Sequence, residues 1–519
     1  MNVNFKPLGL AAAVAAASAG YAGAVSAQAT VASETELGDL AIVPYYTVMD
    51  GYATGVNIIN TSDQTQVLKF RFRRAVDSMD ALDFNVVLSP QDVYTGFIGL
   101  DGDDITWTSN DNSCTAPDYN TGDNKFTMPP IYREGAETGY IEIISMGSPD
   151  SETAPIAKAA KHGADGVPAN CDDVRDNFFA NVLGTGVADL TDRGVIDSET
   201  THQFTTTAAG EVLEATSYVA SADSLKVSYF IKSDETGVEF GDNAIHIAGF
   251  MDGPAMTNQQ QGIFSGDFQG FDHPDLNGGA PLDFVTGAAG TPRGKYNELR
   301  AILGTEALIN DWSKNTIEAL GATVDTDWVV TIPGQYTMLA LGAYLTEGPD
   351  ACLRQTAADI ANAANPTSPV GDVVPCDFRD IPLTATFDVY DREEQGIVVE
   401  EGDLVVSPQP PVISTPKALK DEVNVIQWGE SPVLNAPVTI SVDTPDGAKF
   451  GWASLSTEPA DSNLMICDID FNAQAYNCMD RAIGDTPIVG FVAWQRAFAA
   501  NPGSNYGRIV EHSRVQSAP

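Results

Sequence analysis

The feature that most constrains the fold is an alternation of apolar and polar residues that recurs along the chain. Leucine and phenylalanine alternate with lysine and arginine over residues 68–73, and related alternations occupy residues 84–88, 225–232 and 381–390. A period of two residues is that of a β-strand, whose successive side chains point to opposite faces of a sheet. We therefore predict a mainly β chain, in which one side of each strand is buried and the other faces solvent.

Helix is predicted for a minority of the chain. Residues 296–314 carry apolar side chains at helical spacing despite Gly304, residues 356–365 are rich in alanine, and residues 171–182 allow a third short helix. Between the strands, Gly, Asp, Asn and Pro accumulate in long loops, which are usually functional or stapled when they belong to a compact domain. We expect the helices to be insertions that decorate a framework of strands.

The first 29 residues have the composition of a secretory signal peptide. Lys6 is their only charged residue, and the apolar or small residues from Leu8 to Ala19 are too few to span a bilayer. We predict export to the exterior or the cell surface, with the periplasm less favoured and an N-terminal membrane anchor as the alternative. No transmembrane segment is expected further on, because no later stretch approaches the roughly 20 apolar residues that one requires.

The length of the chain predicts more than one domain. Roughly 490 residues follow the signal peptide, which exceeds a single ordinary core and favours two or three. A proline-rich passage at 404–416 is predicted to be a linker or an edge crossing, since proline cannot serve a central ladder. We expect a β-sandwich module at 30–150, a larger β-rich region with helical insertions at 151–403, and a C-terminal β-rich region at 417–519.

One segment resembles a known class of module. Within residues 54–98, a strand ends in the turn at 60–63, a second strand begins at Val67 and a third ends at Ser89-Pro90. This order is similar to the opening hairpins of bacterial immunoglobulin-like β-sandwich modules, which implies an immunoglobulin-like sandwich. The whole chain also resembles exported bacterial surface proteins, in stretches such as 326–331, and that resemblance implies no particular activity. Sandwich modules serve adhesion, scaffolding and ligand binding, so the fold alone does not choose among these roles.

The six cysteines agree with export, because disulfides persist in oxidising compartments. Six cysteines allow 15 pairings, of which neighbour pairing is the simplest because each bridge closes one local loop. The predicted pairs are Cys114 with Cys171, Cys352 with Cys376, and Cys467 with Cys478. A metal site is the competing interpretation, and it is weakened by the absence of a Cys-x-x-Cys motif and by only five histidines.

The charge of the chain excludes several partners. With 71 acidic against 27 basic residues, the formal net charge is -44. Such a chain repels nucleic acid and anionic lipid and attracts cations, so no nucleic-acid partner is expected. The imbalance also suits a salty exterior, where the screening length is about 8 Å at physiological ionic strength and about 3 Å at 1 M.

Two acidic loops are candidate calcium sites, which makes calcium the one candidate cofactor. The candidate ligands in the first loop are Asp101, Asp103 and Asp104. The candidate ligands in the second loop are Asp267, Asp272, Asp275 and Asn277. Closely spaced carboxylates and amides ahead of a glycine turn supply the oxygens that calcium requires. Neither loop matches the full EF-hand pattern, and a solvated acidic turn is the alternative interpretation.

Three other features have both a functional and a structural interpretation. We expect Trp107, in a polar setting, to pack over its own loop, and a stacking platform for a sugar ring is the alternative. The basic residues at 69–74 are expected to pair within the chain, with an acidic partner subunit as the alternative. His246 alternates with isoleucines, so we expect a satisfied position in a sheet rather than a metal ligand.

No catalytic motif is present, since the chain has neither a nucleophile elbow nor a phosphate-binding loop. We predict an exported acidic surface or extracellular protein that acts by binding or structural assembly, on a cell-surface glycan, a protein or copies of itself. The alternative is a secreted hydrolase of a polysaccharide or peptide that uses a carboxylate pair hidden among the acids. A periplasmic solute binder is disfavoured by the absence of alternating βα units.

Overall fold

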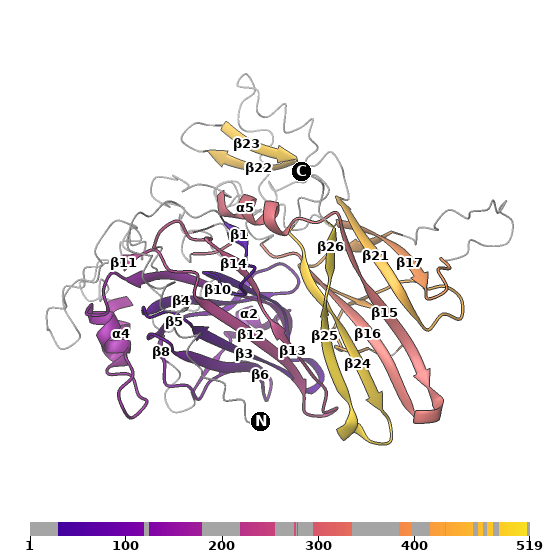
Figure 1. The fold of residues 1–519 in the computed structure, drawn as a ribbon, viewed down its shortest axis with the longest axis horizontal. Coiled ribbons are helices and arrows are strands. Elements are labelled where there is room, and N and C mark those ends of the chain that lie inside the picture. Colours follow the sequence, from indigo (N-terminus) through magenta and orange to yellow (C-terminus); the bar gives the residue numbers. More distant parts are fainter. Residues whose placement is uncertain are drawn as a thin grey trace, which may run out of the picture.

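The structure is a computed structural model, and more than half of the residues that it describes lie in strands. The described residues are 30–118, 124–178, 218–254, 274–276, 278, 294–334, 383–396, 416–430, 432–459, 465–470, 475–480 and 487–515. Within these ranges the chain is mainly β, as the alternation predicts, and its strands form two packed units that lie side by side in Figure 1. We call them the N-terminal sandwich, residues 30–254, and the C-terminal unit, residues 294–515.

The N-terminal sandwich contains two antiparallel sheets. The eight strands of the first are β1 (Val31–Ala32), β2 (Leu40–Thr47), β4 (Gln66–Arg74), β5 (Asp80–Leu88), β8 (Cys114–Ala116), β10 (Thr138–Pro149), β11 (Tyr218–Val219) and β14 (Ile245–Ala248). Their order is β1-β14-β2-β10-β4-β5-β8, with β11 beside β10. The six strands of the second are β3 (Tyr52–Asn60), β6 (Val93–Asp101), β7 (Asp104–Thr108), β9 (Lys125–Thr127), β12 (Leu225–Ser233) and β13 (Glu239–Asn243). Their order is β13-β12-β3-β6-β7-β9.

Aromatic side chains from both sheets form the core of this sandwich. Phe70 of β4 lies with its ring centroid 5.0 Å from that of Trp107 on β7, and Phe84 of β5 lies 6.5 Å from Tyr94 on β6. All four side chains are fully buried. Because burial of one large apolar side chain contributes roughly 1.5–3 kcal/mol, this cluster is a main source of the stability of the sandwich.

The C-terminal unit is built around one ten-stranded sheet, whose strand pairing branches at β15 and β16. Its strands are β15 (Ala307–Ile317), β16 (Ala322–Thr331), β17 (Leu383–Asp391), β18 (Lys417–Leu419), β19 (Val423–Gln427), β20 (Thr439–Ser441), β21 (Phe450–Pro459), β24 (Val489–Phe498), β25 (Tyr506–Glu511) and β26 (Ser513–Val515). The main path runs β18-β17-β21-β15-β16-β19-β20, while β24 joins β16 to β25 and β26 pairs with β15. Its core contains Trp428, whose ring centroid lies 5.7 Å from that of Trp312 and 5.0 Å from that of Trp328.

The remaining described elements are short. They are α2 (Pro130–Arg133), α3 (Pro155–Ala160), α4 (Cys171–Phe178), α5 (Gly294–Leu303), the single turns η1 (Met49–Gly51), η4 (Glu318–Leu320) and η7 (Pro502–Ser504), and the hairpin of β22 (Met465–Asp470) with β23 (Ala475–Asp480). The helix predicted after residue 171 is therefore confirmed as α4. In the part of the chain that the structure describes, no helix has the length and apolar composition needed to cross a bilayer.

The structure bears on two of the three predicted disulfides. Cys114 and Cys171 are bonded, and the bridge ties β8 to α4 as predicted. Cys467 and Cys478 occupy directly opposed positions of the antiparallel hairpin β22–β23. Outside the described residues lie Cys352 and Cys376.

The helix predicted over residues 296–314 is wrong in its second half. Helix α5 ends at Leu303, and β15 begins at Ala307. The misleading signal is the spacing of Leu308 and Trp312, both of which are buried. A separation of four residues places two side chains on the same face of a helix and also of a strand, so this pair does not distinguish the two.

The predicted domain boundaries at 150 and 403 do not separate the packed units. Strand β12 pairs with β3 from Leu225 to Ser233, so residues well beyond 150 complete the N-terminal sandwich. Strand β17, before residue 403, pairs along its length with β21, which follows that residue. The proline-rich passage at 404–416 lies outside the described residues except for Pro416, so its role as a linker stays a prediction.

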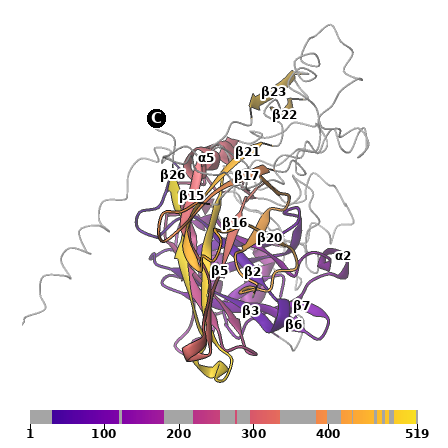
Figure 2. The same ribbon diagram turned by 90° about the vertical axis from the view of Figure 1, so that its right-hand side faces the viewer.

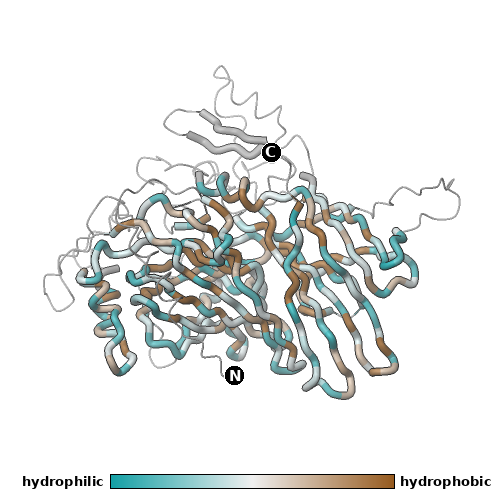
Figure 3. The backbone as a smooth tube through the Cα atoms, viewed as in Figure 1, coloured by the Kyte–Doolittle hydropathy of each residue, from teal (hydrophilic) through white to brown (hydrophobic). Residues whose placement is uncertain are grey.

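The two units share a continuous apolar core. Tyr45 of the sandwich lies with its ring centroid 6.5 Å from that of Phe491 in β24. The hydroxyl of Tyr52 donates to the carbonyl of Val433 at 2.7 Å. Figure 2 shows the two units from the side of the C-terminal unit, and Figure 3 shows apolar residues alternating with hydrophilic ones along the strands of both. These contacts hold the units in one arrangement and create the site described next.

Candidate functional site

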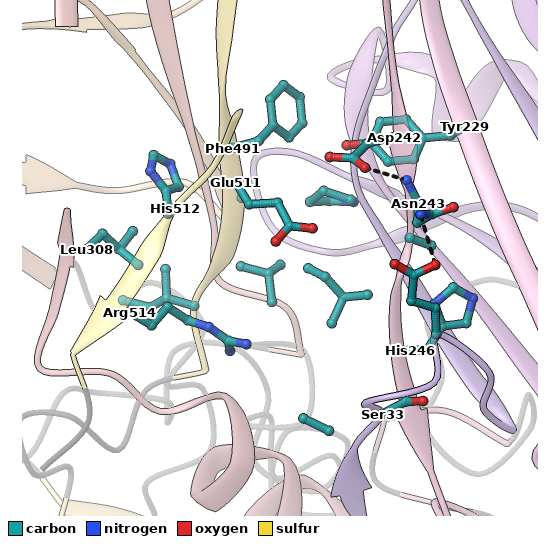
Figure 4. Close-up of a pocket in the computed structure, with 18 of the residues that line it drawn as sticks. Ser33, Tyr229, Asp242, Asn243, His246, Leu308, Phe491, Glu511, His512 and Arg514 are labelled. Atoms are coloured by element: carbon teal, nitrogen blue, oxygen red, sulfur yellow. Dashed lines mark hydrogen bonds between the residues drawn. The ribbon is translucent and has the colours of Figure 1, made fainter. Parts of the chain in front are cut away.

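A pocket of about 310 Å³ lies at the junction of the two units (Figure 4). The sandwich supplies lining residues from β13, from β14 and from the segment at 32–36, and the C-terminal unit supplies them from β24, β25 and β26. Pockets that bind small molecules commonly have volumes of about 300–1,000 Å³ and often lie between domains. The volume and the position are therefore those of a binding site for a small ligand or for one residue of a larger one.

Two carboxylates from different units approach the same space in this pocket. Asp242 lies on β13 and Glu511 at the end of β25, and Figure 4 shows both side chains directed toward the open centre. Tyr229 lies beside Asp242 (Figure 4). Its pKa is raised well above the ordinary value, first by burial and then by the negative charges of Asp242 and Glu511. Both carboxylates thus lie close enough to this one hydroxyl to act on it electrostatically.

Burial raises the pKa of Asp242, and its neighbours act in both directions. The backbone N–H of Asn243 donates to Asp242 Oδ1 at 2.8 Å and favours the charged form, whereas the charge of Glu36 adds to the increase. Glu36 itself accepts a hydrogen bond from Lys226, which lowers the pKa of Glu36. The amide Nδ2 of Asn243 donates to Glu36 Oε2 at 3.1 Å, so one amide residue connects the two acids.

The lining is acidic with a single guanidinium. Four carboxylates and Arg514 line the pocket, and the carboxylates are those of Glu34, Glu36, Asp242 and Glu511. Figure 4 shows the guanidinium of Arg514 directed into the pocket on the side of the C-terminal unit. Apolar surface from Leu308 and Phe491 completes the wall. This combination suits a ligand that carries a positive charge on an apolar frame.

Two histidines line the pocket as neutral parts of the scaffold. His246 Nε2 accepts from the backbone N–H of Val227 at 2.8 Å, and burial lowers the pKa of His246 to about 4. His512 Nε2 donates to the carbonyl of Val329 at 3.1 Å, and burial lowers its pKa to about 4 as well. The satisfied sheet position predicted for His246 is confirmed. Neither imidazole is placed for proton transfer at neutral pH, since both ring orientations are fixed by backbone groups.

The first predicted calcium loop is a tight hairpin turn between β6 and β7. Asp101 pairs with Asp104 in register, Gly102 adopts a left-handed φ of 66°, and Lys125 Nζ lies 2.5 Å from Asp101 Oδ2. Among the described residues, no three His, Cys, Asp or Glu side chains, Asp103 included, form a group that could hold a metal ion. The structure therefore does not bring the carboxylates of this loop together around a common point.

Only part of the second predicted calcium loop is described. Asp275 is buried, and its backbone exchanges hydrogen bonds with Gly278 at 2.9 and 3.2 Å. Outside the described residues lie Asp267, Asp272 and Asn277. Calcium at this second loop stays a prediction.

The alternative interpretation of Trp107, a stacking platform for a sugar ring, is wrong. The side chain is fully buried in the core of the sandwich, where its Nε1 donates to the hydroxyl of Tyr94 at 2.8 Å. A ring with no exposed face cannot stack on a sugar.

The basic residues at 69–74 pair within the chain, as expected, but their predicted exposure is wrong. Lys69 Nζ lies 2.7 Å from Asp83 Oδ2, and both side chains are fully buried. Arg73 Nε lies 3.3 Å from Glu142 Oε2, also in a buried position. Both faces of the sheet are covered at β4, so water does not reach the charged side chains of this strand, and acidic side chains provide their partners instead.

A group of Ser89, His162 and Asp92 has the composition of a catalytic triad without its geometry. The same imidazole nitrogen, Nδ1, lies 3.2 Å from Ser89 Oγ and 3.3 Å from Asp92 Oδ2. In a working triad the two imidazole nitrogens serve different partners, one the nucleophile and the other the carboxylate. This group therefore closes the turn between β5 and β6 and does not activate a nucleophile.

No motif in the sequence marks Asp242, Glu511 or Arg514 as residues of a shared site. With 71 acidic residues in the chain, no local spacing marks these particular ones. Asp242 and Glu511 stand 269 positions apart and meet only because the two units pack together. No protein-family model, no curated protein and no solved structure matches this chain.

Proposed function

We propose that this chain is an exported binding protein whose ligand site is the pocket between the N-terminal sandwich and the C-terminal unit. The ligand is a small molecule, or one exposed residue of a cell-surface partner, that carries a positive charge. The observation that carries the proposal is the convergence of Asp242 and Glu511, from separate units, on one pocket of about 310 Å³. The net charge of -44 supports the same choice, since it attracts cations and repels anions.

Both units contribute to this pocket, so ligand binding is coupled to their packing. A ligand that contacts both Asp242 and Glu511 stabilises the arrangement that brings them together. We infer that the role is binding or assembly outside the cell, consistent with the N-terminal signal composition and with a confirmed disulfide.

The test measures binding of small cations by calorimetry, with arginine, spermidine and glucosamine as probes. Asp242→Asn and Glu511→Gln should each weaken binding about tenfold to a hundredfold, because a hydrogen bond to a charged group contributes roughly 1.5–3 kcal/mol. Asp150→Asn removes an exposed carboxylate outside the pocket and serves as the matched control. If none of the probes binds the native chain, or if all three variants bind equally, the proposal is wrong.

The same two carboxylates favour hydrolysis as a second candidate function. Glycosidases pair one carboxyl group of raised pKa, which acts as general acid, with a second that acts as base or nucleophile. Burial raises the pKa of Asp242 as such an acid requires, and Glu511 faces the same space. Nitrophenyl glycosides distinguish the two functions: a hydrolase releases nitrophenol and loses this activity in both variants, whereas a binding protein releases none.

A further inference from the structure

We propose that the outer face of β17, β21 and β15 binds a neutral polysaccharide. Strands β17 and β21 lie at the edge of the C-terminal unit farthest from the N-terminal sandwich (Figure 1), and none of the three rings that define the surface lines the pocket, so the surface is separate from the pocket and does not depend on it. We call it the aromatic face and define it by Tyr390, Phe450 and Trp452. Its chemistry identifies the class of ligand.

Three aromatic rings stand together on this face. Tyr390 and Trp452 occupy paired positions of β17 and β21, and their rings are stacked with centroids 4.6 Å apart and an angle of 19° between the planes. Trp452 remains 40% exposed and Phe450, two positions earlier on the same side of β21, remains 37% exposed. Exposed rings this close together are unusual on a soluble surface, where they often mark a binding site.

The stacked pair is held rigidly from the core side. The buried Trp312 of β15 donates its Nε1–H to the carbonyls of both Tyr390 and Trp452, at 3.1 and 3.2 Å. Trp312 itself is stacked on Trp428 inside the unit. The backbone under the two exposed rings is therefore fixed before any ligand arrives, which lowers the entropy cost of binding.

Polar side chains flank the rings in the register of the sheet. Asp311 is paired with Trp452 on one side, and the next row places Ser454 between Asp388 and Ile309. Carboxylates accept hydrogen bonds and hydroxyls both accept and donate them, while the rings offer flat apolar surface. A pyranose ring has the complementary form, because its C–H groups make apolar faces and its hydroxyls project from the rim.

The charge selects a neutral glycan over an anionic one. Asp311 and Asp388 border the stacked pair, and the whole chain carries a net charge of -44, so uronate or sulfate groups would be repelled. Arg392, whose guanidinium lies 4.9 Å from the centre of the Phe450 ring, is itself paired with Glu393 at 3.0 Å. The rise along a strand is about 3.3 Å per residue, so Phe450 and Trp452 stand about 7 Å apart along β21. An extended chain of sugar rings can therefore contact more than one aromatic residue at a time.

Native affinity electrophoresis tests the proposal, with laminarin, galactomannan or xylan cast into the gel and alginate as the anionic comparison. We expect at least one of the three neutral polysaccharides to retard the full chain and alginate not to do so. Trp452→Ala and Tyr390→Ala should each raise the apparent dissociation constant about tenfold, which corresponds to about 1.4 kcal/mol. Phe97→Ala is the matched control, since Phe97 is 43% exposed on β6 of the other unit.

Several results would overturn the proposal. These are retardation by alginate alone, no retardation by any neutral polysaccharide, or an equal loss in the Phe97→Ala control. A change from dimer to monomer in sedimentation of Trp452→Ala would assign the face to self-association instead. Tyr390→Phe keeps the ring and should bind like the native chain, which separates loss of stacking from loss of folding. Because the pocket variants Asp242→Asn and Glu511→Gln leave this face intact, the two proposals fail separately.

Discussion

Four buried titratable residues make opposing contributions to stability between about pH 4 and pH 7. Burial raises the pKa of Asp39 and of Asp327 to about 7, against an ordinary value of 3.8. Burial lowers the pKa of His246 and of His512 to about 4, against an ordinary value of 6.5. The aspartates contribute stability that is lost as the pH rises through this window, whereas the histidines contribute stability that is lost as the pH falls. The contributions of these four residues to the free energy of unfolding therefore largely cancel over this window.

We expect Asp327→Asn to reveal this compensation. The carboxylate accepts hydrogen bonds from the backbone N–H groups of Val433 and Leu434 at 2.8 and 2.9 Å, and an amide oxygen can accept both. The contribution of Asp327 to stability decreases as the pH rises, and the variant lacks it. The free energy of unfolding of the variant should therefore rise relative to that of the native chain by about 1.4 kcal/mol per pH unit between pH 4 and 7. Urea denaturation across this range measures the difference, and a constant offset between the two curves would contradict the assignment.

At the scale of the element, β4 shows how a strand is buried on both sides by different means. Phe70 and Phe72 pack into the aromatic core, while Lys69, Arg71 and Arg73 enter buried ion pairs with acids of β5 and β10. The alternation of residue types therefore predicts the strand correctly, but the prediction that its charged side faces solvent is wrong. A sequence alone does not reveal that a charged face will meet its counter-charges inside the protein.

Removal of one member of such a pair should be costly. Asp83→Asn removes the charge of the buried carboxylate that lies 2.7 Å from Lys69 Nζ, and we expect a loss of about 3–5 kcal/mol in the free energy of unfolding. Asp101→Asn breaks the exposed pair with Lys125 and should cost at most about 1 kcal/mol. Chemical denaturation of both variants makes the comparison. Similar losses in the two would show that the Lys69 pair is already hydrated.

The sequence predicts best those elements in which one pattern of apolar and polar residues continues over many consecutive positions. Strands with a clear period of two, such as β4, β12 and β17, were predicted, as were the β class and the Cys114–Cys171 bridge. The error at β15 arose because Leu308 and Trp312 stand four residues apart, a spacing shared by both kinds of element. The immunoglobulin-like relationship and export stay predictions.

At the scale of the whole molecule, the two units behave as one folded body. One buried cluster includes Leu40 and Val43 of the sandwich together with Val329, Val425 and Phe491 of the C-terminal unit. The pocket could not be predicted from the sequence, because it depends on this packing and not on any local motif. A single cooperative unfolding transition is the expected consequence.

Phe491→Ala tests the coupling of the units. The ring is buried between Tyr45 and Tyr229, and its loss should cost about 3–5 kcal/mol and separate the unfolding of the two units. Phe387→Ala removes a ring of the same size from the core of the C-terminal unit alone, so it should destabilise without releasing the sandwich. Differential scanning calorimetry distinguishes one peak from two. Two separate peaks in the native chain would contradict the shared core.

The pocket joins parts of the chain that are made at very different times. The segment at 32–36 emerges from the ribosome early, whereas Glu511, His512 and Arg514 follow almost five hundred residues later. A chain that stops before residue 511 lacks the wall of the pocket that Glu511, His512 and Arg514 supply. Binding at the proposed site would therefore require a chain whose synthesis has passed residue 514 and whose two units have packed together.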